Sequence, residues 1–225
     1  RIFIKLGKNF NKISLTKDDI IIAGCSIIDK NVSDFACNNN LGGLEFLSCI
    51  PGSIGGAVIM NSGCYNNDIS KVLLSIKAID IKECKEKNIS REEIKFIYRG
   101  TNLPSDLIIT SVKLKGEIAD KKIIEEKQFK MIEKKKLSQP SQIKTCGSTF
   151  KNYNNEKKAW QLIKETGCDN FFVGDAVISK KHCNFFVNNG NAKSSDIEKL
   201  IKRVKKRVNE KVGVNLELEI KIIGE

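Results

Sequence analysis

Residues 50–68 read IPGSIGGAVIMNSGCYNND, which combines four glycines, three asparagines, two serines and a proline with an apolar run at 57–60. A flexible surface linker has no need of that apolar run. Glycine leaves the backbone bare where it must take a positive φ or lie against a flat or anionic ligand. Taken by itself, the stretch therefore allows two interpretations: a tight connection in a β-rich domain, or a loop that cradles a cofactor.

The composition indicates a globular protein with reduced thiols. The 225 residues are 40% hydrophobic, so the chain can form one or two domains with a substantial core. The sequence has no segment with the length and apolarity of a membrane-spanning helix, and we expect no membrane partner. The eight cysteines include no Cys-x-x-Cys pair and the chain has one histidine, so we expect neither a disulfide framework nor a metal site.

The chain is strongly basic, with a formal charge of +12. Such an excess is typical of nucleic-acid binders. However, only five of the 39 basic residues are arginines, and the lysines are not interleaved with aromatic residues. Arginine is the residue that binds phosphates and guanines through two parallel hydrogen bonds. We therefore expect an anionic small molecule as the partner, and no nucleic acid.

Hydrophobic periodicity predicts an α+β fold whose strands are concentrated in the first half of the chain. The β-rich runs cover residues 19–27, 72–81 and 106–116. In the last run, the two-residue period places four side chains on one face: Ile108, Thr110, Val112 and Leu114. Residues 118–136 have near-helical spacing of their apolar positions, which predicts a long basic helix between two halves of the chain.

The last third of the chain has signals for one more helix and one more strand. Ser195 followed by Glu198 predicts a capping box at the start of the helix, and Gly213 predicts its end. Residues 214–223 then alternate between apolar and polar, which predicts a strand with one buried face. That face consists of Leu216, Leu218, Ile220 and Ile222.

Five segments, taken in order, resemble the signatures of one enzyme family. They read GLEFLSCIPGSIGGAVIMNSGCY (43–65), YRGT (98–101), CGSTFKN (146–152), KHCNFFVNNGNA (181–192) and LELEIKIIGE (216–225). Together they are similar to the UDP-N-acetylenolpyruvoylglucosamine reductases, the MurB family of peptidoglycan synthesis. The resemblance covers the chain from about residue 40 to its end, and five matches in the family's order are a highly specific signal.

The resemblance implies a fold and a division into domains. It implies an incomplete FAD-binding domain of the PCMH/VAO-like type, represented by its second subdomain at residues 1–117. A MurB-type substrate-binding domain follows at 118–225, and the strand at 214–225 is expected to return to the first domain. The family's N-terminal FAD-binding subdomain, with its loop around the pyrophosphate, is expected to be missing from this sequence. Asp175 stands where the family usually has glycine, so a turn is expected to differ there.

The resemblance also implies an activity, in the bacterial cytoplasm and in cell wall biosynthesis. NADPH reduces FAD, and the reduced flavin then reduces UDP-N-acetylglucosamine enolpyruvate to UDP-N-acetylmuramate by hydride addition at C3 and protonation at C2. In this assignment Arg99 stabilises the enolate, Ser148 donates the proton and Glu219 is the acidic partner. Cys146, two residues before Ser148, is interpreted as a packing residue. The oligomeric state stays open.

Binding residues follow from the same resemblance. The positions expected to line FAD are Ile50, Pro51, Gly52, Ser53, Gly55, Gly56 and Ala57. For the substrate the resemblance implies Tyr65, Asn152 and Lys136, the last at the diphosphate. Because Lys134 and Lys135 adjoin Lys136, the choice among the three lysines stays open.

Two other functions remain as alternatives at the level of sequence. Another FAD-dependent oxidoreductase of the same fold would share the cofactor loop but would not need a proton-donating serine. A basic, flavin-free binding module would explain the charge, but it would leave the motifs around Arg99, Ser148 and Glu219 without a reason.

Overall fold

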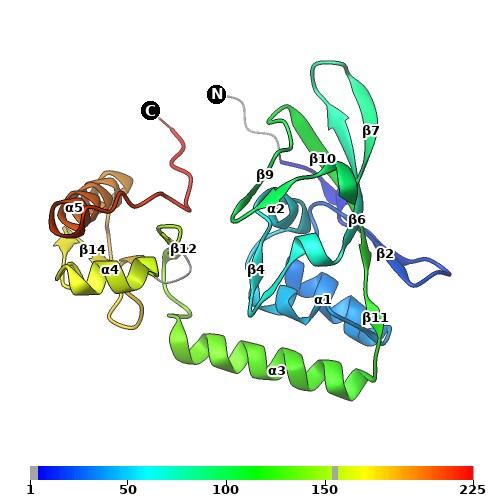
Figure 1. The fold of residues 1–225 in the computed structure, drawn as a ribbon, viewed down its shortest axis with the longest axis horizontal. Helices are drawn as coiled ribbons and strands as arrows, with labels where there is room; N and C mark the ends of the chain where they lie inside the picture. Colours follow the sequence, from blue (N-terminus) through cyan, green and yellow to red (C-terminus); the bar gives the residue numbers. More distant parts are fainter. Residues whose placement is uncertain (1–4, 154–156, 225) are drawn as a thin grey trace. The chain divides into compact units, whose positions relative to one another are not determined.

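The protein forms two compact units, Arg1–Lys135 and Lys136–Glu225, each with its own hydrophobic core. Its structure, a computed structural model, describes residues 5–153 and 157–224 (Figure 1). Both units combine an antiparallel sheet with helices, so the predicted α+β class is confirmed.

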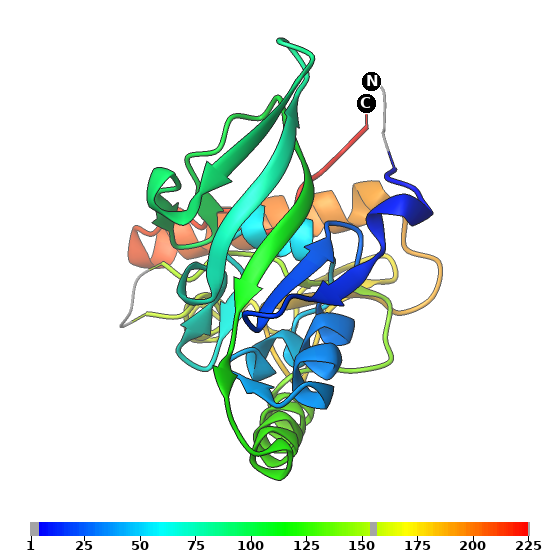
Figure 2. The same cartoon turned by 90° about the vertical axis from the view of Figure 1, so that its right-hand side faces the viewer.

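The first unit is built on a five-stranded antiparallel sheet in the order β1-β2-β10-β6-β7. Figure 2 shows β10 in green between β2 in blue and β6 in turquoise. The strands are β1 (Ile13–Leu15), β2 (Ile20–Gly24), β6 (Leu73–Asp80), β7 (Lys85–Ser90) and β10 (Leu107–Lys115). The three runs predicted to be strands form β2, β6 and β10, which are the central strands, so these predictions are confirmed.

A β-bulge in β10 changes which side chains face the core. Ile109 pairs with Ala78 and Ser111 pairs with Lys77, so Thr110 is an extra residue in the ladder. An extra residue shifts the alternation of side chains by one position. Ile109 is therefore buried while Ile108 is only half-buried, which corrects the predicted face; Thr110, Val112 and Leu114 are buried as predicted.

The core of the first unit lies where helices cover the sheet. These are α1 (Asp29–Asn38), α2 (Ile54–Ile59) and the 3₁₀ helix η2 (Glu45–Cys49). They bury Phe46, Leu47 and Ile54 completely, and fully burying such a side chain contributes roughly 1.5–3 kcal/mol. The shorter elements are η1 (Lys8–Phe10), β3 (Leu41–Gly42), β4 (Gly63–Cys64), β5 (Asn67–Asp68), η3 (Ile69–Lys71), η4 (Arg91–Glu93), β8 (Phe96–Ile97), β9 (Gly100–Thr101) and β11 (Glu117–Ile118).

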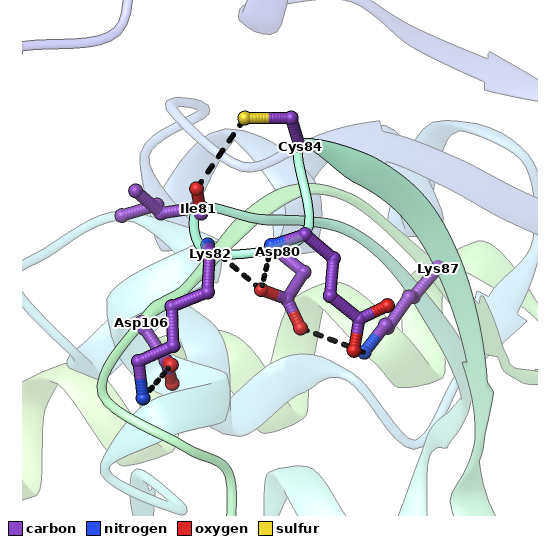
Figure 3. A network of polar contacts seen from close by, with 7 residues as sticks. Asp80, Ile81, Lys82, Cys84, Lys87 and Asp106 are labelled. Carbon is purple, nitrogen blue, oxygen red and sulfur yellow. Dashed lines mark hydrogen bonds and ion pairs between the residues drawn. The ribbon is translucent and has the colours of Figure 1, made fainter.

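The hairpin β6–β7 ends in a polar turn (Figure 3). Asp80 accepts hydrogen bonds from the backbone N–H groups of Lys82 (2.9 Å) and Glu83 (3.1 Å), and its other oxygen pairs with Lys87 at 2.6 Å. Cys84 is exposed at this turn, and its thiol donates to the carbonyl of Ile81 at 3.5 Å. The turn therefore depends on backbone capping by Asp80, and Cys84 is an ordinary surface thiol.

The long helix α3 (Lys121–Ser138) follows β11, as Figure 1 shows. Its first turns belong to the first unit, because Ile124 is 1% exposed there and Gln128 Nε2 donates a buried hydrogen bond of 2.7 Å to Ser33 Oγ of α1. The division between the compact units therefore falls after Lys135. The predicted division at 117/118 is too early, since it assigns these anchoring residues to the second domain.

The second unit has a four-stranded antiparallel sheet in the order β12-β15-β14-β13. Its elements are β12 (Thr145–Ser148), α4 (Ala159–Glu165), β13 (Phe172–Val173), β14 (Ala176–Ile178), β15 (Phe185–Asn188) and α5 (Ser194–Val212). Helix α5 buries Leu200, Ile201 and Val204 against this unit's core.

The structure confirms the predicted end of α5 but not its predicted start. Its start is two residues earlier than the predicted capping box, because Asp196 closes the first turn by accepting from the N–H of Lys193 at 3.0 Å. Gly213 ends the helix as predicted, in a left-handed conformation (φ 68°).

Residues 214–224 do not form the predicted strand of the first domain. They run along residues 149–151 of the second unit, with hydrogen bonds from Lys151 N to Glu217 O and from Glu219 N to Thr149 O, both 2.9 Å. Leu216 is buried in the core of the second unit, whereas Ile222 is 49% exposed. The predicted alternation fails at its C-terminal end because the backbone pairing stops there. Of the helices in the described residues, none has the length and apolarity needed to cross a membrane.

Asp29 is a buried carboxylic acid at the start of α1. It is 1% exposed, and within the described residues neither of its carboxylate oxygens has a hydrogen-bond partner. Burial raises the pKa of Asp29 to about 7. Because the folded-state pKa lies above the unfolded value, its stabilising effect is full below about pH 4 and is lost as the pH rises through 7.

We expect Asp29→Asn to remove this pH dependence. At pH 8 the variant should be more stable than the parent by up to about 4 kcal/mol, since one pKa unit corresponds to about 1.4 kcal/mol. Near pH 4.5 the difference should fall to about 1 kcal/mol, because the carboxyl group of the unfolded chain is already largely ionised there whereas that of the folded chain is not. Urea unfolding at both pH values measures the difference, with Asp34→Asn, at an exposed site paired with Lys30, as the matched control. A stabilisation of equal size at both pH values would contradict a raised pKa.

Candidate active site

The glycine-rich stretch is attached to the first unit along one side. Ile28 and Ser53 form a β-bridge, and the N–H of Asp29 donates to the carbonyl of Gly52 at 3.0 Å. The N–H of Gly55 donates to the carbonyl of Cys25 at 3.0 Å. A Cβ at Gly55 would lie 2.8 Å from the Cβ of Cys25, so this position has room only for glycine.

The other side of the stretch is bare backbone. Pro51, Gly52 and Gly56 are exposed, and a Cβ at Gly56 would have no neighbour nearer than Ser53 Oγ at 3.6 Å. Ile50 and Ser53 are half-buried. Such a surface fits a flat ligand that packs against main chain. Among the predicted cofactor positions Gly55 and Ala57 differ, because both are buried and pack inside the unit.

Two tight turns carry the predicted residues Tyr65 and Arg99. Tyr65 and Asn66, between β4 and β5, both have positive φ (52° and 65°), as a type I′ turn requires. Arg99, in the turn between β8 and β9, also has positive φ, 56°. A left-handed residue other than glycine costs on the order of 1–2 kcal/mol, and such strain is concentrated at functional sites.

The structure brings the turn of Arg99 against the hairpin of Tyr65. The guanidinium of Arg99 donates a long hydrogen bond, 3.5 Å, to the carbonyl of Gly63, and it lies 4.9 Å from the ring centre of Tyr98. Asn61 Nδ2 donates to the carbonyl of Ile97 at 3.3 Å. A cation and two aromatic rings thus come from neighbouring turns of one unit.

Two lysines of α3 belong to the same neighbourhood. The ammonium of Lys134 lies 5.1 Å from the ring centre of Tyr65, and that of Lys135 donates to the carbonyl of Cys49. The backbone carbonyl of Lys136 accepts from Lys181 in the second unit. The prediction named Lys136 and left its two neighbours open. The sequence could have predicted that Lys135 faces the first unit. It continues the i, i+4, i+7, i+11 spacing of Ile124, Gln128 and Met131, which lie on that face of the helix.

In the second unit, the predicted residues Ser148 and Glu219 lie on adjacent segments. Ser148 ends β12 opposite Phe185, and it follows Gly147, whose φ is 85°. The N–H of Glu219 donates to the carbonyl of Thr149, the residue after Ser148. The arrangement therefore places the backbone segments that carry Ser148 and Glu219 side by side. Arg99, the third predicted catalytic residue, belongs to the first unit.

The structure gives the contacts or the exposure of three other residues of the second unit that the sequence analysis named. Asn152 Oδ1 accepts from the N–H of Ala159 at 3.2 Å, so its side chain caps α4. Asp175 lies in the turn between β13 and β14, and its Oδ2 accepts from the N–H of Asn191 at 2.8 Å, which attaches that turn to a neighbouring loop. Cys146 is exposed, so its interpretation as a packing residue is wrong.

Within residues 5–153 and 157–224, no three side chains of His, Cys, Asp or Glu are grouped so that they could hold a metal ion.

Comparison with known proteins covers nearly the whole chain. Residues 1–85 match a family described as FAD binding domain, and residues 139–223 match the UDP-N-acetylenolpyruvoylglucosamine reductase, C-terminal domain. The UDP-N-acetylenolpyruvoylglucosamine reductase of Pelagibacter ubique is 49% identical over 99% of this chain and 74% of its own length. That of Rickettsia prowazekii is 41% identical over 99% of this chain and 75% of its own length.

A solved structure gives the same result. The crystal structure of UDP-N-acetylenolpyruvylglucosamine reductase (MurB) from Thermus caldophilus superposes with a TM-score of 0.82 and 32% identity, over 95% of this chain and 74% of that one. Two domain matches in order, relatives that align along the whole chain and a shared fold agree. The chain belongs to the UDP-N-acetylenolpyruvoylglucosamine reductase family.

Proposed function

We propose that this protein reduces UDP-N-acetylglucosamine enolpyruvate to UDP-N-acetylmuramate with electrons from NADPH, for peptidoglycan synthesis in the bacterial cytoplasm. The observation that carries the proposal is the 49% identity to a reductase of this name along 99% of the chain. The turn that carries Arg99 supports it, because it fixes a guanidinium against the hairpin at the end of the glycine-rich stretch.

When bound, FAD would supply the redox chemistry, the passage of two electrons from NADPH to C3 of the enolpyruvyl group as hydride. The exposed main chain of Pro51, Gly52 and Gly56 would hold the flavin, with Ile50 and Ser53 at its margin. The match of residues 1–85 to an FAD binding domain supports this part. Gly55 and Ala57 would act indirectly, by keeping the loop pressed onto the unit's core.

Arg99 would stabilise the charge that develops when hydride reaches C3. Addition there leaves negative charge at C2 that spreads onto the carboxylate as an enolate, and a guanidinium fixed before the reaction stabilises it without reorganisation. The backbone of Arg99 is held by its turn, and its side chain is held between the carbonyl of Gly63 and the ring of Tyr98. These contacts restrict the direction in which the cation can point.

Ser148 would then deliver a proton to C2. A hydroxyl is a weak acid, so this role needs a site that stabilises the charge left on the oxygen. The segment of Glu219 lies beside Ser148 through the Thr149 carbonyl, and the carboxylic acid of Glu219 would serve as the acidic partner of the substrate. Gly147, the residue before Ser148, has a φ of 85°, and a Cβ there would have no neighbour within 4 Å, so a substrate atom would meet no side chain at this position.

The substrate's diphosphate would be bound by lysine and by Tyr65. Lys136 is the position implied by the family, and Lys134 stacks on the ring of Tyr65. Asn152, whose side-chain oxygen caps α4, would be the amide of the same substrate pocket. Another FAD-dependent oxidoreductase of the fold is the weaker candidate, since residues 139–223 match the reductase's own C-terminal domain.

The two half-reactions test the proposal. In the full-length protein, Ser148→Ala should leave the bleaching of FAD by NADPH nearly normal, because that step needs no proton at C2. Reoxidation by the enolpyruvyl substrate should slow by about 10²–10⁴-fold, the usual contribution of a general acid. Stopped-flow absorbance of the flavin measures each step.

Two further variants make this test specific. Ser148→Cys should recover part of the second step, since a thiol also donates a proton. Arg99→Ala should slow the same step, and a thiol at position 148 should not rescue it. If Ser148→Ala slowed both half-reactions equally, the serine would be shaping the flavin site rather than donating a proton.

The lysines should affect binding rather than chemistry. Lys136→Ala should raise the substrate KM about 10–100-fold with little change in kcat, because a charge-assisted hydrogen bond contributes about 1.5–3 kcal/mol in ground and transition state alike. Lys134→Ala is measured in parallel, to decide which of the neighbouring lysines binds the diphosphate. Lys130→Ala, at an exposed site paired with Glu126, is the matched control and should leave KM unchanged. A fall in kcat at constant KM would assign Lys136 to the chemistry instead.

A further inference from the structure

Asn184 is a buried amide next to the segment that follows Ser148. It is 3% exposed and lies one residue before β15, whose ladder with β12 ends at the pair of Ser148 and Phe185. The chain turns there, because the N–H of Phe185 donates to the carbonyl of His182 at 2.9 Å. Past Ser148 the regular ladder is over, so the backbone groups of the residues that follow need other partners.

Asn184 supplies those partners with both its backbone and its side chain. Its carbonyl accepts from the N–H of Thr149 at 2.7 Å. Its Oδ1 accepts from the N–H of Phe150 at 2.9 Å, and its Nδ2 donates to the carbonyl of Phe150 at 2.8 Å. These contacts fix the orientation of the amide, since a backbone N–H can only donate and a carbonyl can only accept. The side chain of Asn184 thus pairs with Phe150 as the backbone of a neighbouring strand would.

Residues 217–219 pair with the opposite edge of residues 149–151. The N–H of Glu219 donates to the carbonyl of Thr149 at 2.9 Å, so Thr149 bonds to Asn184 through its N–H and to Glu219 through its carbonyl. Both predicted catalytic residues of this unit are therefore adjacent to one short segment, which Asn184 holds from its other side.

We propose that Asn184 is a positioning residue for the reduction: by holding the backbone of residues 149–150, it fixes the hydroxyl of Ser148 and the backbone of Glu219 for proton delivery to the substrate. The inference rests on the function proposed above. Asn184 acts through the backbone of Thr149 and Phe150. Proton delivery is sensitive to such positioning, because a displacement of about 1 Å can slow a reaction by about 10²-fold.

Removal of the amide should affect one half-reaction. Asn184→Ala leaves the N–H and the carbonyl of Phe150 without their side-chain partner at a buried site, so the segment should loosen. In the full-length protein we expect reoxidation of the flavin by the enolpyruvyl substrate to slow about 10–100-fold. Bleaching of FAD by NADPH should stay nearly normal, because it needs no proton from Ser148. Stopped-flow absorbance of the flavin measures both steps.

Hydrogen–deuterium exchange tests the contact without relying on activity. In Asn184→Ala the amides of Thr149 and Glu219 should exchange up to about tenfold faster, since they open together with the loosened segment. The amides of α5 should exchange as in the parent. Unchanged exchange at Glu219 would overturn the inference. Faster exchange with reoxidation at the parent's rate would also overturn it, because Asn184 would then stabilise the fold without positioning the reacting groups.

Asn184→Asp provides a readout that a general loss of stability would not produce. A protonated carboxyl group can replace the amide, because it accepts from the N–H of Phe150 and donates its O–H to the carbonyl, whereas an ionised group turns a negative charge toward that carbonyl. Burial and the carbonyl should raise the pKa of the new carboxyl group. Its reoxidation rate, divided by the parent's, should therefore be highest at low pH and should fall toward that of Asn184→Ala as the pH rises. A ratio that stayed near one up to about pH 9 would contradict the need for a donor at this position.

The comparison with the parent also accounts for His182, a titratable side chain in contact with Asn184. Its Nδ1 accepts from the N–H of Asn184 at 3.3 Å, and burial lowers the pKa of His182. Because the parent and the variant both contain this imidazole, the ratio of their rates removes its own titration.

Asn188→Ala is the matched control. This asparagine lies at the other end of β15, and its Oδ1 accepts from the N–H groups of Gly190 and Ala192. Its removal should lower stability without slowing reoxidation, and slowing equal to that of Asn184→Ala would contradict the proposal. The proposed function fails separately: normal reoxidation in Ser148→Ala would contradict the role of that serine, while the exchange rates would still decide whether Asn184 holds the segment.

Discussion

The close approach of Gly55 to Cys25 is the constraint on which the first unit's site depends. Because a Cβ at position 55 would lie 2.8 Å from the Cβ of Cys25, the stretch can lie on the end of β2 only with glycine there. The contact orients α2 so that Ile54, Ala57 and Val58 are buried. The opposite side then presents Pro51, Gly52 and Gly56 as bare main chain. A single stretch thus contributes to the core on one side and forms the proposed cofactor surface on the other.

Two strained turns and one buried carboxyl group belong to the same unit as that surface. Tyr65 and Arg99 both have left-handed backbone conformations that side chains rarely adopt, and their hairpins contact each other through Gly63. Asp29 lies under Gly52, and its backbone N–H donates a hydrogen bond to the carbonyl of Gly52. The carboxyl group of Asp29 is buried and has no hydrogen-bond partner among the described residues. These features lower the stability of the first unit, and the large core around Phe46 and Leu47 offsets them.

Local sequence patterns were sufficient for the central strands and for the end of α5. The β-rich runs at 72–81 and 106–116 were found by alternation, and Gly213 by its position after an amphipathic helix. The bulge at Thr110 was not predictable, because one extra residue in a ladder depends on the partner strand. The alternation of residues 214–223 predicted the burial of Leu216 correctly but not that of Ile222. A strand also needs a backbone partner, and the pairing with residues 149–151 stops before Ile222, which is exposed.

The different roles of Gly55 and Gly56 can be measured directly. FAD is titrated into the full-length apoprotein, and its binding is monitored by the quenching of flavin fluorescence. Gly56→Val adds side-chain atoms to the exposed face, where a Cβ meets only Ser53 Oγ at 3.6 Å. We expect its apoprotein to unfold at the parent's temperature and its Kd for FAD to rise at least about tenfold, which corresponds to about 1.4 kcal/mol. Gly55→Val should instead destabilise the apoprotein itself. An unchanged Kd in Gly56→Val would contradict the assignment of this main-chain surface to the cofactor.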